Sequence, residues 1–217
     1  MDRRHTGSST RTTFAAPATI EGVDIDTPHG PARATLHAAA NARAALVLGH
    51  GAGGSIGSAD LRAATEAALA QSVTVVLVEQ PYLVAGRRSA APAPQLDSAW
   101  RTVVEQLPLG GLPLIAGGRS AGARVACRTA AETNAVAVLC LAFPVHPPGR
   151  PEKSRLAELD AVAVPVLVVQ GTSDPFGMPP EAPNREVVRV AGNHSLARSR
   201  DAVAAAVGDW LARTLVF

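Results

Sequence analysis

The chain has 217 residues, of which 47% are hydrophobic and 18% charged, and its net charge is +2. This composition is typical of a globular domain with a real core and excludes a disordered chain. Scarce aromatic residues, scattered arginines and the lack of an apolar run near ~18 residues argue against nucleic-acid and membrane partners.

Residues 1–13 are polar and lack the apolar core of a signal peptide, so we expect a flexible tail before a single domain at 14–217. Two β-type runs at 18–26 and 32–38 flank a turn at Pro28, His29 and Gly30, which predicts a hairpin. The next predicted elements are strands at 44–48 and 73–78 and helices at 58–71 and 95–107. Ser58 is the expected N-cap of the first helix.

The second half continues the alternation of strands and helices. Its predicted elements are strands at 112–116, 135–143, 164–169 and 186–190 and helices at 121–132 and 199–215. Continuous apolar strands that alternate with helices indicate a mostly parallel sheet with helices on both faces. Such sheets bind ligands at the carboxyl ends of their strands. Cys127 and Cys140 lie among apolar residues and are expected to be buried, reduced thiols of a cytoplasmic protein.

The segment Gly118-Arg119-Ser120-Ala121-Gly122 follows a predicted strand and begins a predicted helix. This is the context of a nucleophile elbow, a strained turn that exposes a reactive serine hydroxyl at a helix N-terminus. A glycine-rich turn with an N-cap serine is the alternative. The context favours Ser120 as a nucleophile, with the N–H of Ala121 as one oxyanion donor.

A nucleophilic serine needs a base, and the base needs an orienting acid. In the elbow arrangement the acid and then the histidine follow the serine along the chain. Asp174 lies just after the strand predicted at 164–169, and His194 lies just after the one at 186–190. Both positions are at the carboxyl edge of the sheet, where Ser120 also lies. We therefore expect Ser120, His194 and Asp174 to form a catalytic triad.

A second oxyanion donor is expected in the glycine-rich loop after the strand at 44–48, from the N–H of Ala52 or Gly51. His50 in this loop is interpreted as structural. The spacing of Gly49, Gly51 and Gly54 also matches a dinucleotide-binding fingerprint, which would indicate a nicotinamide-dependent oxidoreductase. That reading is disfavoured because three further residues precede the predicted helix, and because it leaves the triad unexplained.

Four residues near the predicted site are candidate substrate contacts. Tyr82 and Arg87 follow the strand at 73–78, Arg119 precedes Ser120, and His146 follows the strand at 135–143. If these residues converge, the pocket is basic and favours an anionic or polar acyl substrate. Solvated loop residues are the alternative interpretation for each.

The motifs resemble the α/β-hydrolase superfamily, and more narrowly the small branch shared by the NSL-complex subunit 3 and testis-expressed protein 30. The chain is also similar to dienelactone-hydrolase-like enzymes. The matching stretches are 49–54, 80–82, 117–122, 144–149, 169–177 and 192–195. The resemblance implies a three-layer α/β fold with an eight-stranded, mostly parallel sheet, Ser120 as nucleophile, His194 as base and Asp174 as its partner. It implies no particular substrate, and some relatives serve as scaffold subunits.

These observations predict a serine hydrolase of a small carboxylic ester, thioester or related acyl compound. The expected partner is the small-molecule acyl substrate, with no cofactor and no metal. The segments between predicted elements are too short for a separate cap domain. A non-catalytic scaffold that binds a partner protein is the alternative, and the oligomeric state stays open.

Overall fold

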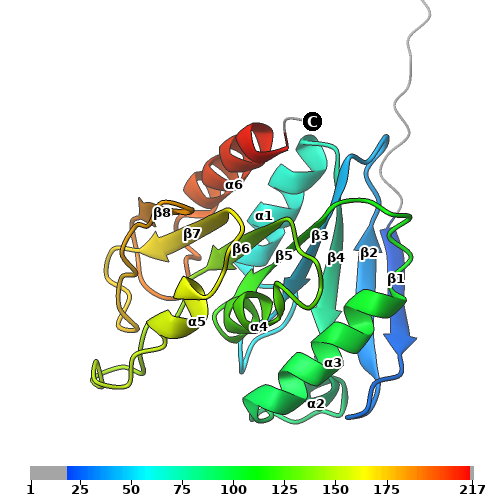
Figure 1. Cartoon of the computed structure of the whole chain (residues 1–217), viewed down its shortest axis with the longest axis horizontal. Helices are drawn as coiled ribbons and strands as arrows, with labels where there is room; N and C mark the ends of the chain where they lie inside the picture. Colours follow the sequence, from blue (N-terminus) through cyan, green and yellow to red (C-terminus); the bar gives the residue numbers. More distant parts are fainter. Residues whose placement is uncertain (1–18, 216–217) are drawn as a thin grey trace, which may run out of the picture.

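An eight-stranded sheet forms the centre of the computed structural model, which describes residues 19–215 (Figure 1). Its strands are β1 (Thr19–Ile25), β2 (Ala32–His37), β3 (Ala44–Gly49), β4 (Val73–Glu79), β5 (Leu114–Arg119), β6 (Ala137–Leu141), β7 (Val166–Gly171) and β8 (Arg185–Val190). The order across the sheet is β1-β2-β4-β3-β5-β6-β7-β8. Strand β2 runs antiparallel to both β1 and β4, and all the other neighbours are parallel. The predicted tail at 1–13 lies outside the described residues.

Helices cover both faces of this sheet (Figure 1). One face carries α1 (Ala59–Ala70) and α6 (Arg200–Thr214), and the other carries α2 (Pro81–Val84), α3 (Ala93–Gln106), α4 (Ala121–Thr129) and α5 (Leu156–Asp160). None of the helices within residues 19–215 is both long and apolar enough to cross a membrane. The predicted three-layer fold is confirmed, and the described chain carries no cap domain over the sheet.

Each face of the sheet has its own hydrophobic cluster, which explains the continuous apolar strands. In β3, Leu46 and Leu48 contribute to the cluster with α1 and α6, whereas Val47 between them contributes to the cluster with α3 and α4. Successive side chains of a strand point to opposite faces, so a strand buried on both sides needs apolar residues throughout. The inward residues predicted for α6, such as Val203 and Trp210, are buried.

The structure differs from the prediction at three elements. Strand β5 begins at Leu114 and continues through two glycines to Arg119, because Gly118 pairs with Gly49 on one side and with Cys140 on the other. The short helices α2 and α5 fall in segments expected to be loops or left unassigned. With 4 and 5 residues, they are too short to show a helical repeat of apolar residues.

The two cysteines lie in the core, as predicted. Cys127 on α4 and Cys140 on β6 are both buried and unbridged, and their sulfur atoms lie 3.5 Å apart. The hydrogen bond to Cys127 and, after it, burial raise the pKa of the Cys140 thiol. The pair therefore packs as two buried, unbridged thiols between α4 and β6.

Candidate active site

Ser120 occupies a strained turn between β5 and α4. Its backbone has φ 52° and ψ −107°, in a region that residues other than glycine rarely adopt. The flanking glycines make the turn possible, since a Cβ atom at Gly118 would lie only 2.6 Å from the carbonyl oxygen of Gly49. The geometry is that of the predicted nucleophile elbow, with the serine at the N-terminus of a helix.

The structure brings together the three residues of the predicted triad. Nε2 of His194 lies 2.9 Å from Oγ of Ser120, and Nδ1 of His194 lies 2.8 Å from Oδ2 of Asp174. The Asp174 side chain is fully buried, and that of His194 is 16% exposed. A carboxylate can only accept at Nδ1, so it holds the imidazole in the tautomer whose Nε2 accepts the Ser120 proton.

Gln170, near the end of β7, is a site residue that the sequence reasoning missed. Its amide nitrogen donates to Oδ2 of Asp174 at 2.8 Å, and also lies within hydrogen-bond distance of the carbonyl oxygens of Phe143 and Gly177. Its side chain is fully buried. The signal in the sequence was a single polar residue at the end of an apolar strand. Gln170 fixes the carboxylate oxygen that faces His194.

Phe176 was also missed. Its N–H donates to Oδ1 of Asp174 at 2.9 Å, and its ring stacks on the imidazole of His194 with centroids 4.1 Å apart and an interplanar angle of 30°. The ring covers one face of the imidazole. The loop from Asp174 to Phe176 therefore holds both the Asp174 carboxylate and the His194 imidazole.

The predicted oxyanion donors lie beside the nucleophile. Ala121 is the first residue of α4, so its N–H has no carbonyl partner within the helix. Gly51 lies against Ser120, since a Cβ atom at Gly51 would be 3.6 Å from Cβ of Ser120. Its carbonyl oxygen accepts from the N–H of Gly54, which closes the loop into a tight turn that also contains Ala52.

Tyr82 has a different partner from the substrate contact predicted for it. Its hydroxyl donates to the carbonyl oxygen of Ala52 at 2.8 Å, and only 5% of the residue is exposed. Burial raises the pKa of Tyr82 to about 12. Tyr82, held by α2 after the end of β4, thus anchors the loop 49–54, which carries the predicted oxyanion donors and is called the oxyanion loop below.

For the serine hydrolase predicted from the sequence, we expect Tyr82→Phe to lower kcat for ester hydrolysis several-fold and to leave KM nearly unchanged. A lost hydrogen bond of this kind is worth about 1 kcal/mol, and the loop it anchors carries Gly51 and Ala52, the predicted oxyanion donors. Steady-state kinetics on a short p-nitrophenyl ester measures both constants. A rise in KM without a change in kcat would instead place the Tyr82 hydroxyl on the substrate.

The other three candidate substrate contacts, His146, Arg119 and Arg87, lie in different surroundings from one another. Nδ1 of His146 lies 2.9 Å from the carbonyl oxygen of Pro147, and its Nε2 packs against Gly177 in the loop after Asp174. The Arg119 guanidinium contacts protein groups on both sides, as described below. Arg87 alone of the four candidates is exposed, in the turn after α2 beside a cavity of about 70 Å³.

His50 is a structural residue of the oxyanion loop, as interpreted from the sequence. Its Nε2 accepts the backbone N–H of Gln80 at 3.0 Å, and its Nδ1 lies 2.8 Å from the carbonyl oxygen of Gly51. These partners require a neutral ring with the proton on Nδ1. Burial lowers the pKa of His50, and the neighbouring Gly51 carbonyl and Glu79 charge oppose this only in part.

The lowered pKa of His50 predicts a loss of stability on acidification. The unfolded chain binds the proton near pH 6.5 and the folded chain does so only at lower pH, so the free energy of unfolding falls as pH drops below 6.5. Urea unfolding between pH 5 and 8 measures the slope. His50→Gln is expected to be less stable at neutral pH but to show a shallower slope. His37, whose pKa burial also lowers, keeps part of the slope in that variant.

The glycine fingerprint does not take its dinucleotide-binding form. Helix α1 begins at Ala59, five residues after Gly54, whereas the fingerprint places its last glycine at the start of the helix. The loop instead turns back at Gly51 and lies beside Ser120.

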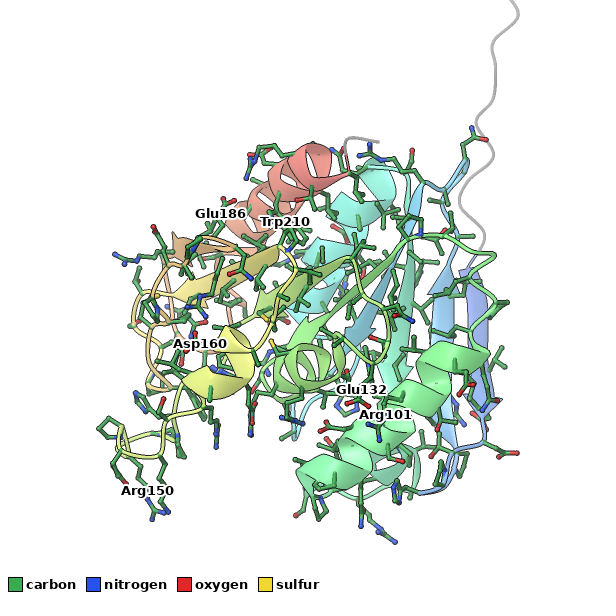
Figure 2. The ribbon with its side chains drawn as sticks, viewed as in Figure 1. Arg101, Glu132, Arg150, Asp160, Glu186 and Trp210 are labelled. Atoms are coloured by element: carbon green, nitrogen blue, oxygen red, sulfur yellow. The ribbon has the colours of Figure 1, made fainter. Side chains whose placement is uncertain are left out.

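A groove of about 740 Å³ lies away from the triad, between α3 and the segment after α4. Arg101 and Glu132 form an ion pair at its wall (Figure 2). It reaches Leu114, the first residue of β5, and so lies at the opposite edge of the sheet from Ser120.

The chain matches a known protein family in sequence, and it is similar to several solved structures in fold. A family model described as an alpha/beta hydrolase domain matches residues 42–203. No curated protein sequence matches the chain. A lidless a/b serine hydrolase, XC6422 from Xanthomonas campestris, is 21% identical, with a TM-score of 0.75 over 90% of this chain and 95% of its own. Est1E from Butyrivibrio proteoclasticus is 17% identical, with a TM-score of 0.74 over 91% and 100%. Dienelactone hydrolase from Anabaena variabilis is 18% identical, with a TM-score of 0.73 over 92% and 99%.

Proposed function

Because the chain belongs to the family of alpha/beta hydrolase domains, we propose that it is a serine hydrolase of a small carboxylic ester, thioester or related acyl compound. One observation carries the proposal: His194 lies within hydrogen-bond distance of both Ser120 Oγ and the buried carboxylate of Asp174. This arrangement activates a hydroxyl that is otherwise a weak nucleophile. Solved structures with this fold include an esterase and a dienelactone hydrolase, as their names state.

In the proposed acylation step, Ser120 Oγ attacks the substrate carbonyl carbon while Nε2 of His194 takes its proton. The N–H groups of Ala121 and of Ala52 or Gly51 stabilise the negative charge on the carbonyl oxygen. The tetrahedral intermediate then collapses, the imidazolium gives its proton to the leaving alcohol or thiol, and the acyl group stays on Ser120.

Deacylation repeats these steps with water. His194 takes a proton from water as the oxygen attacks the acyl carbon, and it then returns the proton to Ser120 as the acid leaves. Asp174, held by Gln170 and Phe176, stabilises the imidazolium in both halves of the reaction. Every proton therefore passes through one ring whose orientation the Asp174 loop determines.

A small acyl group suits the surroundings of Ser120 best. The glycine loop lies directly against the serine, and the aromatic content of the chain is only 3%. We further propose that the chain is a member of the small branch of NSL-complex subunit 3 and testis-expressed protein 30, on the basis of the six matching stretches of sequence. We also propose a cytoplasmic location, since the two cysteines are unbridged.

Labelling with a fluorophosphonate probe tests the proposal. We expect the wild-type protein to form one adduct, mapped to Ser120 by mass spectrometry, and to hydrolyse p-nitrophenyl acetate. A panel of oxygen and sulfur esters with acyl chains of increasing length then identifies the preferred substrate, with kcat/KM expected to be highest for short chains. A folded protein that forms no adduct and turns over no ester contradicts the proposal and favours the scaffold alternative.

A further inference from the structure

The guanidinium of Arg119, next to the nucleophile, contacts three segments that build the site. Its Nε lies 2.8 Å from Oδ2 of Asp60 at the start of α1. Its Nη2 donates to the backbone carbonyl oxygen of His194 at 3.1 Å. Its Nη1 lies against Gly51, where a Cβ atom would approach to 2.6 Å. One planar group therefore lies between α1, the loop of the base and the oxyanion loop.

The contact with Asp60 is rigid because both partners are confined. The Asp60 side chain is fully buried, and that of Arg119 is 17% exposed. Oδ1 of Asp60 accepts from Ser58 Oγ at 2.6 Å and from the N–H of Leu61 at 2.9 Å. The hydroxyl of Ser58, predicted to cap α1 itself, thus supports the carboxylate instead.

Oδ2 of Asp60 depends on Arg119 for its charge balance. No side chain or backbone group in the described residues makes an aligned hydrogen bond to this buried oxygen, so the ion pair with Nε is its one compensating contact there. A buried carboxylate without a countercharge is strongly destabilising. The pair therefore fixes where the guanidinium lies, and the other two nitrogens follow from its planar shape.

The contacts with His194 and Gly51 turn this fixed position into an effect on the site. The imidazole of His194 is held at Nδ1 by Asp174, and Arg119 holds the backbone carbonyl of the same residue. Gly51 can approach the guanidinium this closely only because it has no side chain. A shift of about 1 Å in groups of this kind costs about 10²-fold in rate.

From these contacts we infer that Arg119 is a positioning residue, which, through its ion pair with Asp60, holds the His194 backbone and the oxyanion loop in register with Ser120. The inference rests on the proposed function and deepens it by assigning a role to the residue that precedes the nucleophile. It replaces the substrate contact expected for Arg119. A lysine at this position has one ammonium group and cannot reach Asp60 and His194 together while supporting Gly51.

Four variants test the inference: Arg119→Met, Arg119→Lys, the double variant Arg119→Met with Asp60→Asn, and Arg124→Met as a control. Arg124→Met removes a part-buried ion pair between Arg124 on α4 and Glu158 on α5, and Arg124 has no ion pair with the His194 loop in the described residues. We expect Arg119→Met to lower kcat for p-nitrophenyl acetate about 10²-fold with little change in KM. Compared with Arg119→Met, Arg119→Lys is expected to have a higher melting temperature, but its kcat is expected to stay below a tenth of the wild-type value.

The double variant separates stability from positioning. Removing both charges is expected to restore the melting temperature relative to Arg119→Met, because no unpaired carboxylate stays buried, but to leave kcat low. Full recovery of kcat in the double variant or in Arg119→Lys would overturn the inference. So would a loss in Arg119→Met no larger than that in Arg124→Met.

A readout independent of turnover is the NMR signal of the His194 Nδ1 proton, which lies in the hydrogen bond to Asp174. We expect this signal to shift or broaden in Arg119→Met and to persist in Arg124→Met. An unchanged signal in Arg119→Met overturns the positioning role, even if the wild type proves inactive. A wild type that shows neither labelling nor turnover overturns the proposed function, and the proton signal then decides this inference by itself.

Discussion

Ser120→Ala is expected to lower kcat for ester hydrolysis by about 10⁴-fold or more and to abolish fluorophosphonate labelling. The variant keeps the backbone turn but loses the oxygen that attacks the carbonyl. Only the oxyanion donors and substrate binding then contribute to the remaining rate. The variant is expected to stay folded, because alanine is close to serine in size and the hydroxyl it removes is hydrogen-bonded to His194. Stopped or initial-rate assays with melting curves measure both effects.

A matched control is Ser98→Ala on α3, at the groove far from the triad. It is expected to keep wild-type turnover and labelling. If both Ser120→Ala and Ser98→Ala had the wild-type rate, the hydrolysis would arise at another group or from a contaminant. The proposed nucleophile would then be wrong.

Asp174→Asn is expected to lower kcat by up to about 10⁴-fold with the fold preserved. All three polar partners of this carboxylate are donors: the ring of His194, the amide of Gln170 and the N–H of Phe176. Asparagine brings an NH₂ group that must face one of them. Where it faces Nδ1, the ring proton moves to Nε2, and His194 can no longer accept the proton of Ser120.

The double variant Ser120→Ala with Asp174→Asn sharpens this prediction. If the residues act as one unit, it loses no more activity than Ser120→Ala alone. Asp201→Asn, at the exposed start of α6, is the control and is expected to behave as wild type. Independent, multiplying losses in the double variant would show that Asp174 acts apart from the serine.

The fold, and the meeting of Ser120, Asp174 and His194 at one place, could be predicted from sequence because their signals are local. Apolar runs such as 73–78 predict buried strands, and the carboxyl ends of parallel strands meet at one edge of the sheet. Ser120, Asp174 and His194 each follow a strand, so the sheet itself brings them together. The glycines around Ser120 also indicate the elbow, since a turn this tight excludes a Cβ atom at Gly118.

The residues that hold the triad in place could not be predicted in the same way. Tyr82 and Arg87 look alike in sequence as loop residues after β4, yet one is buried beneath the oxyanion loop and the other is exposed. Gln170 is only a polar residue in an apolar strand until the folded chain places Asp174 beside it. Side-chain direction and burial depend on which segments pack together, and the local pattern does not contain that information.

The sequence by itself determined the order of the strands along the chain, the turn at Ser120, and the choice of His194 and Asp174 as the proposed base and acid. Only the tertiary structure decided that Arg119 faces Asp60 and the carbonyl of His194, rather than open solvent beside a substrate. The physical reason is the cost of burying charge. Once α1 places the Asp60 carboxylate out of contact with water, the guanidinium is the group that balances it, and its position follows from that pairing.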